Sequence, residues 1–222
     1  MRLSQMALRN LGRNKRRTFL AALSVGIAML IVMFLDGFIG GFVGNMVGNY
    51  TKNDVGDVNV ATASYRERER FMPVAEYIRD SGAVAETIRS LPALKGRVAT
   101  VAERIRFGVI LSSGSLSKAA LCVAGDPETE RSLLMLDRSI RAGGAYLSAP
   151  GDAIIGAGLA KDLGLAVGDT LKVVTEKADY GLGFKRFRVS GVFATNVNSL
   201  DGNLFQVSLG DARDLLGMEG GA

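Results

Sequence analysis

The sequence of 222 residues contains no histidine, no tryptophan and a single cysteine, Cys122. Without histidine the chain cannot form a Ser-His-Asp triad, a Cys-His catalytic pair or a histidine-ligated metal site. A single cysteine cannot form a disulfide within the chain, and its apolar neighbours in AALCVAG indicate a small buried side chain. These absences exclude most of the familiar designs of hydrolases and metalloenzymes.

Two nucleotide-binding patterns are also missing or incomplete. The phosphate-loop pattern GxxxxGK[ST] does not occur, so the chain cannot hold ATP in that way. Gly156 and Gly158 follow a predicted strand, as in a dinucleotide-binding turn, but Lys161 stands where a third glycine or alanine belongs. No carboxylate pair and no activated nucleophile stands out. The sequence therefore predicts a non-catalytic chain without a cofactor or a metal.

Positive charge is concentrated at the N-terminus. Residues 1–17 hold six cations and no acid, whereas the other 21 of the 27 Lys and Arg residues are balanced by all 22 Asp and Glu residues. A nucleic-acid-binding protein spreads cations over its folded face, so no nucleic-acid partner is expected. Residues 1–17 are predicted to be a cytoplasmic, basic amphipathic segment on membrane lipids, with a disordered tail as the alternative. The cations assigned to the membrane interface are Arg9, Arg13, Lys15, Arg16 and Arg17.

A long apolar run follows these cations. Residues 19–35 carry no charge, and the stretch 18–42 exceeds the ~20 residues needed to cross a bilayer. A cleaved signal peptide is the alternative, but its apolar core is usually shorter, at about 7–15 residues. Because the cations precede the run, the N-terminus is predicted to be cytoplasmic and residues 43–222 to form an extracytoplasmic domain.

Small residues recur near the end of the apolar run. Gly40, Gly44 and Gly48 are spaced four residues apart and would lie on one face of a helix. Small side chains at this spacing let two helix backbones approach closely, which predicts a helix-packing surface. The alternative is that the glycines only loosen the helix where it leaves the membrane.

The remaining sequence predicts a mixed α+β domain, in one piece or in two lobes. A strand is expected over 56–62, a charged loop over 64–73 and a helix within 73–96, broken at Gly82. Further along the chain, two or three strands are expected in 97–125, followed by a helix over 126–138 with an Asp cap. A strand–helix–turn–strand unit is expected over 152–174. Strands over 184–196 and 203–209 and a helix over 210–218 complete the predicted domain.

The ordered set of motifs resembles the FtsX/MacB-type permeases of ABC transporters over nearly the whole chain. Six stretches carry the resemblance, beginning with the basic entry into the first membrane helix. They are ALRNLGRNKRRTFL (7–20), GDVNVATASYRE (56–67), VAGDPETE (123–130), IIGAGLAKDLGLAVGDTL (154–171), FRVSGVFATN (187–196) and VSLGDARDLLG (207–217). The motif positions assigned a structural role are Gly125, Asp126, Pro127, Gly156, Leu159, Ala160, Gly164, Gly168, Asp169 and Gly191.

The resemblance implies a MacB-like periplasmic core domain on a bacterial inner-membrane helix. It also implies a homodimeric or heterodimeric permease partner and a cytoplasmic ABC ATPase subunit that drives the extracytoplasmic domains. The substrate would be a lipoprotein or another amphiphile, a drug or a peptide. The 56–67 and 123–130 stretches favour the lipoprotein-release branch.

The family carries three more membrane helices after this domain. The sequence is therefore expected to be an N-terminal fragment or a split subunit of a permease. A membrane-tethered, non-catalytic binding or scaffold domain is the alternative function.

Overall fold

The computed structural model describes residues 15–50, 58–141, 143–195 and 197–222, and for 41–50 only the backbone. The chain divides into two compact units, Met1–Asp57 and Val58–Ala222. Each unit is described by itself.

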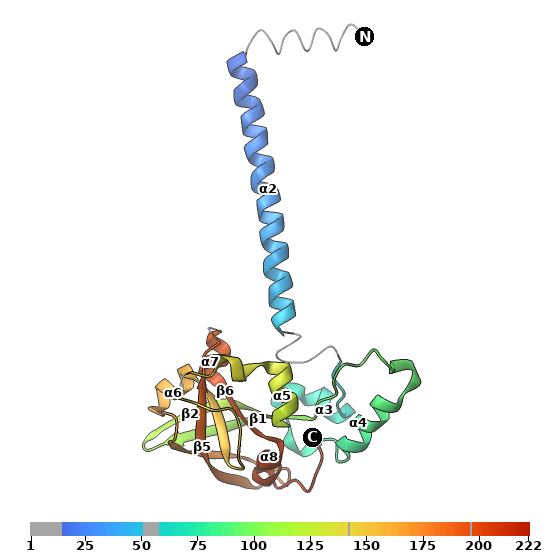
Figure 1. The fold of residues 1–222 in the computed structure, drawn as a ribbon, viewed down its shortest axis with the longest axis vertical. Helices are drawn as coiled ribbons and strands as arrows, with labels where there is room; N and C mark the ends of the chain where they lie inside the picture. The colour runs from blue at the N-terminus through green and yellow to red at the C-terminus, as the bar shows by residue number, and fades with distance from the viewer. Residues whose placement is uncertain (1–14, 51–57, 142, 196) are drawn as a thin grey trace. The chain divides into compact units, whose positions relative to one another are not determined.

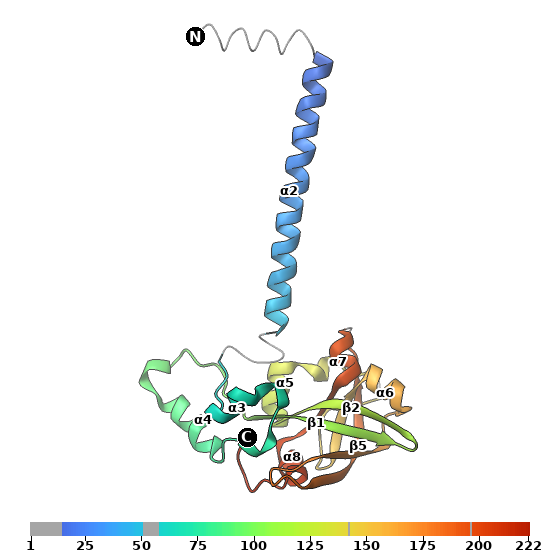
Figure 2. The same ribbon diagram turned by 180° about the vertical axis from the view of Figure 1, so that it is seen from behind.

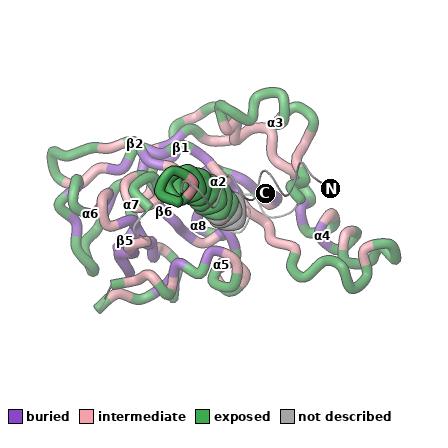
Figure 3. The backbone as a smooth tube through the Cα atoms, turned by 90° about the horizontal axis from the view of Figure 1, so that it is seen from above, coloured by how far each residue is buried: buried purple, intermediate pink, exposed green. Residues whose placement is uncertain are grey.

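The described part of the first unit is one helix, α2 (Lys15–Tyr50). Within it, Lys15–Gly40 is long and apolar enough to cross a membrane, with a mean hydropathy of 2.5. None of this stretch is buried within the protein, and Figure 3 shows nearly all of it as exposed. The helix continues eight residues beyond the predicted end at residue 42.

The second unit begins with helices instead of the expected strand. Residues 58–62 have no regular structure, and both Val58 and Val60 are more than half exposed, so the alternating pattern does not bury one face of a strand. The expected loop at 64–73 is instead α3 (Ala63–Arg68) followed by the 3-10 turn η2 (Glu69–Phe71). Thr62 starts α3, because its side chain accepts a hydrogen bond from the backbone N–H of Tyr65 at 3.2 Å.

A short helical segment leads from α3 to the sheet. After the 3-10 turn η3 (Val74–Glu76), α4 (Ser81–Ser90) is capped by Asp80, whose carboxylate accepts from Ala83 N at 3.0 Å. Gly82 lies within the first turn of α4 and does not break it, contrary to the prediction. Helix α4 ends just before Pro92, and Pro92–Leu94 forms the 3-10 turn η4.

Six strands then form a closed barrel in the order β1-β2-β6-β3-β5-β4. The strands are β1 (Arg104–Ser113), β2 (Leu116–Gly125), β3 (Asp152–Gly156), β4 (Thr170–Glu176), β5 (Leu182–Phe193) and β6 (Leu204–Ser208). The 97–125 stretch contains two of them, β1 and β2, joined by a tight turn at Gly114. This hairpin projects from the side of the barrel in Figure 2.

The interior of the barrel holds the main apolar core. Phe107, Leu111, Phe187 and Phe205 are almost fully buried, and the rings of Phe187 and Phe205 meet edge to face with centroids 5.6 Å apart. Purple segments in Figure 3 follow these strands. The mixed α+β domain predicted from the sequence is confirmed.

A second apolar cluster covers one outer side of the barrel. Helix α5 (Pro127–Leu134) and the 3-10 turn η5 (Leu136–Ser139) replace the single predicted helix over 126–138, because Met135 adopts a left-handed φ of 50° that ends α5. Tyr146 and Leu147 complete this cover over β2, β3 and β6.

Two of the remaining helices, α6 and α8, confirm predicted units, whereas α7 was not predicted. Helix α6 (Ala157–Leu163) follows β3, and α8 (Leu209–Leu216) follows β6, while α7 (Asn198–Asn203) lies just before β6. The last residues return to the start of the unit, where Ile78 and Ala222 exchange two backbone hydrogen bonds at 2.8 and 3.1 Å. Residues 58–222 therefore form one unit and not two lobes.

Candidate functional site

The predicted membrane-interface cations lie partly outside the described residues, since Arg9 and Arg13 precede residue 15. Lys15, Arg16 and Arg17 form the first turn of α2. Cations at a helix N-terminus oppose the helix dipole, so this placement does not stabilise the helix itself. It suits contact with anionic lipid headgroups, and that role stays a prediction.

The predicted helix-packing glycines all lie in α2. A side chain at Gly40 would meet nothing within 4 Å, so the structure leaves room for another helix there. For Gly44 and Gly48 only the backbone is described. The packing role of the three glycines stays a prediction.

The motif Gly125-Asp126-Pro127 organises the junction between β2 and α5. The Asp126 carboxylate accepts from Thr129 N at 3.0 Å, and Pro127 is the first residue of α5, which confirms the predicted cap. A Cβ at Gly125 would lie 2.5 Å from Cγ of Glu130, so only glycine leaves space for that side chain. Glu130 is itself buried and binds the guanidinium of Arg104 through two hydrogen bonds of 2.7 and 2.9 Å.

The longest motif forms β3, α6 and the turn into β4. Leu159 and Ala160 are buried and pack α6 against the barrel. Gly164 ends α6 with a left-handed φ of 63°, a conformation that glycine adopts without strain. Gly168 has φ of 97° in the turn before β4, and Asp169 closes this turn by accepting from Ala166 N at 2.8 Å.

Two motif glycines allow close backbone approaches. A Cβ at Gly156 would lie 2.7 Å from Cα of Asp201 in α7, and a Cβ at Gly191 would lie 2.6 Å from the carbonyl oxygen of Ala145. Gly191 directly follows a bulge in β5, where Ser190 donates to the carbonyl of Ala153 at 3.1 Å. Both glycines are therefore required by the packing of neighbouring segments.

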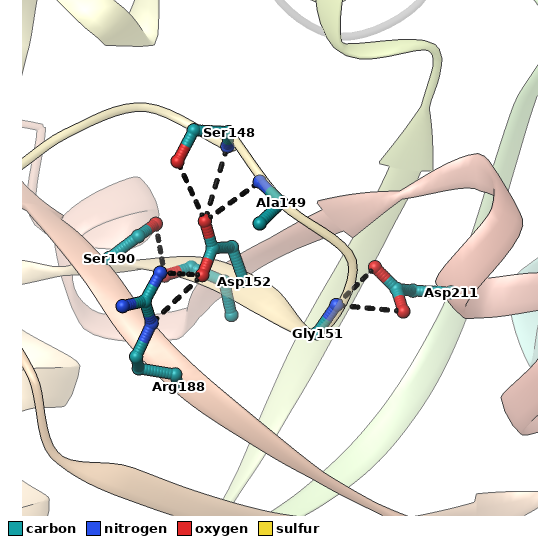
Figure 4. Close-up of polar contacts among 8 residues, drawn as sticks. Ser148, Ala149, Gly151, Asp152, Arg188, Ser190 and Asp211 are labelled. Atoms are coloured by element: carbon teal, nitrogen blue, oxygen red, sulfur yellow. Dashed lines mark hydrogen bonds and ion pairs between the residues drawn. The ribbon is translucent and has the colours of Figure 1, made fainter.

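A carboxylate that the sequence did not single out, Asp152, lies at the centre of a buried polar network (Figure 4). Asp152 is 2% exposed, and one of its oxygens accepts from Nε and Nη2 of Arg188 at 3.0 and 2.6 Å. Its other oxygen accepts from the backbone and hydroxyl of Ser148 and from Ala149 N, at 2.9–3.2 Å. Burial alone would raise the pKa of Asp152, but these hydrogen bonds outweigh it and lower the pKa.

A second carboxylate, Asp211 on α8, holds the same loop from the other side (Figure 4). It accepts from Gly151 N at 3.0 Å, from the Ser208 hydroxyl at 2.7 Å and from Nζ of Lys185 at 2.8 Å. Burial acts to raise the pKa of Asp211, and the hydrogen bonds from Lys185, Gly151 and Ser208 lower it overall. The loop 148–152 is thus fixed to β5 and to α8 at once.

The chemistry of these groups is structural. Asp152 and Asp211 have their oxygens occupied by protein donors and hold no substrate-facing lone pair of a general base. A cavity of about 210 Å³ lies at Arg188. It is lined by Gly143, Ala145, Ser148, Val167, Gly168, Arg188, Val189 and Ser190. Within the described ranges, no cluster of three or more acidic or cysteine side chains could hold a metal. Cys122 is fully buried, as predicted, and burial raises the pKa of its thiol.

The arrangement defines a class of protein: an α+β barrel domain that follows one helix of membrane-spanning length. The chain belongs to the MacB-like periplasmic core domain family, whose profile matches residues 18–220. The resemblance to FtsX/MacB-type permeases is thereby confirmed.

A comparison with solved structures found one of low similarity to report. It is the extracellular domain of the noncanonic ABC-type transporter YknZ from Gram-positive bacteria, at 12% identity and a TM-score of 0.47, covering 65% of this chain and 70% of that one. No curated protein matches the sequence significantly.

The close approach at Gly156 gives a first prediction. Gly156→Ala forces α7 away from the end of β3, because the new methyl group overlaps the Asp201 backbone. Overpacking of this kind costs about 1–3 kcal/mol, and we expect thermal unfolding in detergent to begin several degrees lower. Gly108→Ala is the control, since a Cβ there meets nothing within 4 Å. Equal unfolding temperatures for the two variants would contradict this account.

The Asp152 network predicts an acid-sensitive contribution to stability. The lowered pKa means that this contribution is present above the unfolded aspartate value of about 3.9 and is lost as the pH falls through the folded value. Asp152→Asn should therefore lower the free energy of unfolding by about 1–3 kcal/mol at pH 7. The difference in the free energy of unfolding between Asp152→Asn and the unsubstituted chain should shrink below pH 4.

Glu128→Gln, on the exposed face of α5, is the matched control and should leave the pH profile unchanged. Denaturant unfolding at pH 3 to 7 measures all three proteins. A constant difference between Asp152→Asn and the parent at every pH would show that the carboxylate charge is not the stabilising feature.

Proposed function

We propose that this chain is, or forms part of, the membrane subunit of an ABC transporter. The observation that carries the proposal is the family match over residues 18–220, which takes in both the apolar helix and the barrel domain. The helix supports it, because apolar side chains such as Leu30, Met33 and Phe34 are about two-thirds exposed and need lipid or other helices around them.

In this proposal the N-terminal cations stay in the cytoplasm, next to a partner ABC ATPase, and the barrel lies outside the inner membrane. ATP binding and hydrolysis by the partner would move the membrane helices, and the barrel would transmit that movement to a lipoprotein, drug or peptide. A closed barrel that is stabilised by buried ion pairs suits this task, because it resists deformation. The chain itself would catalyse no reaction.

The orientation can be tested by cysteine labelling of intact cells. Ser132→Cys on the exposed side of α5 should react with a membrane-impermeant maleimide, whereas the native Cys122 is buried and should not. Ser4→Cys should react only after the cells are permeabilised, because the positive segment is retained inside. Labelling of Ser4→Cys in intact cells, with Ser132→Cys protected, would reverse the proposed topology.

The transporter role can be tested through the ATPase partner. The chain, tagged at its N-terminus and extracted from its own membranes, should bring with it a subunit that hydrolyses ATP. The untagged chain carried through the same purification is the control. A folded, outward-facing chain that repeatedly purifies without any ATPase would favour the tethered binding or scaffold domain instead.

A further inference from the structure

An arm made of α4 and the segment that follows it extends from the side of the barrel. Helix α4 leads outward, residues 91–98 turn, and residues 99–103 return to β1 (Figure 1, Figure 2). Among residues 81–102, which we call the arm, only Ser81 and Ala85 are buried, and neither apolar core cluster includes any of them. The arm therefore lies outside both cores and is open to solvent along most of its length.

One carboxylate holds the base of the arm. Glu103 accepts hydrogen bonds from the Ser81 hydroxyl at 2.7 Å and from Nη2 of Arg213 on α8 at 3.0 Å. Farther out, Nη2 of Arg89 donates to the backbone carbonyl of Val101 at 3.4 Å and joins α4 to the returning segment. These contacts join the two limbs of the arm and attach them to α8, which keeps the outer end in one orientation.

The outer end of the arm carries apolar and cationic side chains together. Leu91 is 42% exposed and Val98 is 38% exposed, and the two residues flank the turn. Lys95 and Arg97 lie within the turn on either side of Gly96, whose φ of 75° is left-handed. Both cations are exposed, and within the described residues neither takes part in an ion pair. We call Leu91, Lys95, Arg97 and Val98 the tip.

Positive charge is concentrated in the arm. Residues 81–102 hold three cations and one acid, whereas the rest of the second unit holds 17 cations and 18 acids. Exposed apolar side chains also occur on β5, but there Leu182 lies opposite Glu176, and an acid opposes contact with an anionic surface. Unpaired cations beside exposed apolar side chains are typical of surfaces that bind anionic lipid bilayers.

We propose that the tip docks the barrel domain on the anionic lipid headgroups of the membrane in which α2 is anchored. Lys95 and Arg97 bind lipid phosphates, and Leu91 and Val98 enter the boundary between the headgroups and the acyl chains. This contact goes beyond the proposed transporter role, because it assigns the domain a lipid partner of its own. It rests on that role only in that α2 anchors the chain in a bilayer.

The length of the chain allows the domain to reach its own membrane. Residues 41–50 of α2 add ~15 Å beyond the apolar stretch that ends at Gly40. The chain from Tyr50 to Val58 spans at most ~29 Å, so Val58 lies within about 45 Å of the bilayer. A domain of this length is itself about 40 Å across. Because the anchor confines the domain near the lipid, a contact that is weak in free solution can still be occupied.

Fluorescence quenching in lipid nanodiscs tests the contact with the full chain. A polarity-sensitive maleimide dye is attached at Ala93→Cys, which is exposed in η4, while the native Cys122 is buried and should not react. In discs of phosphatidylcholine with phosphatidylglycerol, a nitroxide-bearing lipid should quench this dye. The quenching should fall in discs of phosphatidylcholine alone and at ~1 M salt, where charges are screened beyond about 3 Å. The same dye at Ser117→Cys, at the start of β2, is the control and should remain unquenched.

Removal of the two tip cations tests the role of charge. Lys95→Gln with Arg97→Gln should lower the ratio of docked to undocked chains about 30-fold, because each cation near an anionic bilayer contributes a factor of about five. Leu91→Ser should lower this ratio about tenfold through the loss of apolar contact. Lys172→Gln with Arg186→Gln removes two exposed cations of β4 and β5 and is the matched control, which should leave the ratio unchanged. All variants should unfold at the same temperature as the unsubstituted chain.

Each of four results would overturn the proposal. The first is quenching at Ala93→Cys no greater than at Ser117→Cys, and the second is equal quenching with and without phosphatidylglycerol. The third is an equal loss of docking in the two glutamine pairs. The fourth is protection of Ala93→Cys from an aqueous maleimide in native membranes without quenching in the discs, which would assign the tip to an acidic protein partner.

The nanodisc measurement is independent of the proposed topology, because a disc offers both of its lipid surfaces to the domain. If quenching fails while Ser132→Cys labels from outside the cell and an ATPase purifies with the chain, only the lipid contact is wrong. If quenching is observed while the labelling or the ATPase association fails, the transporter role is wrong and the lipid contact stands.

Discussion

The pairing of β1 with β4 is the constraint on which the rest of the domain depends. Only three residue pairs join these strands, from Ile110–Val174 to Ser112–Lys172, yet they close the sheet into a barrel. A side-chain hydrogen bond strengthens the closure, since the buried hydroxyl of Thr175 donates to the Gly108 carbonyl at 2.8 Å. Closure joins the two ends of the sheet and encloses the aromatic core. It also places β1, β4 and β5 side by side on the outside.

The polar network around Asp152 and Asp211 stabilises the part of the barrel that lies away from the β1–β4 pairing. Asp152 and Asp211 fix the loop 148–152 to β5 and α8, so the entry to β3 cannot shift relative to its neighbours. Glu130 with Arg104 fixes α5 to the start of β1. These ion pairs fix the surrounding loop and helix to the strands of the barrel, which suits the proposed role of a part that transmits movement.

Local patterns in the sequence were sufficient for much of the fold. The strand–helix–turn–strand unit over 152–174 and the Asp126 cap were predicted correctly, because glycine and aspartate at such positions act on their nearest neighbours. The strand predicted over 56–62 is absent from its described residues 58–62, because alternation alone does not supply a partner strand, and Thr62 starts a helix instead. Asp152 was missed because its partner Arg188 is 36 positions away, and only the parallel pairing of β3 with β5 brings them together. The barrel closure was missed for the same reason.

The central claim is that the barrel moves as a rigid body when the partner ATPase binds ATP. Single-molecule FRET on the reconstituted complex tests it, with one dye pair at Ile39→Cys and Ser132→Cys and another at Ser117→Cys and Ser132→Cys. The account predicts that a non-hydrolysable ATP analogue changes the first distance and leaves the second, within the barrel domain, unchanged. A changed distance within the domain, with the first distance constant, would contradict it.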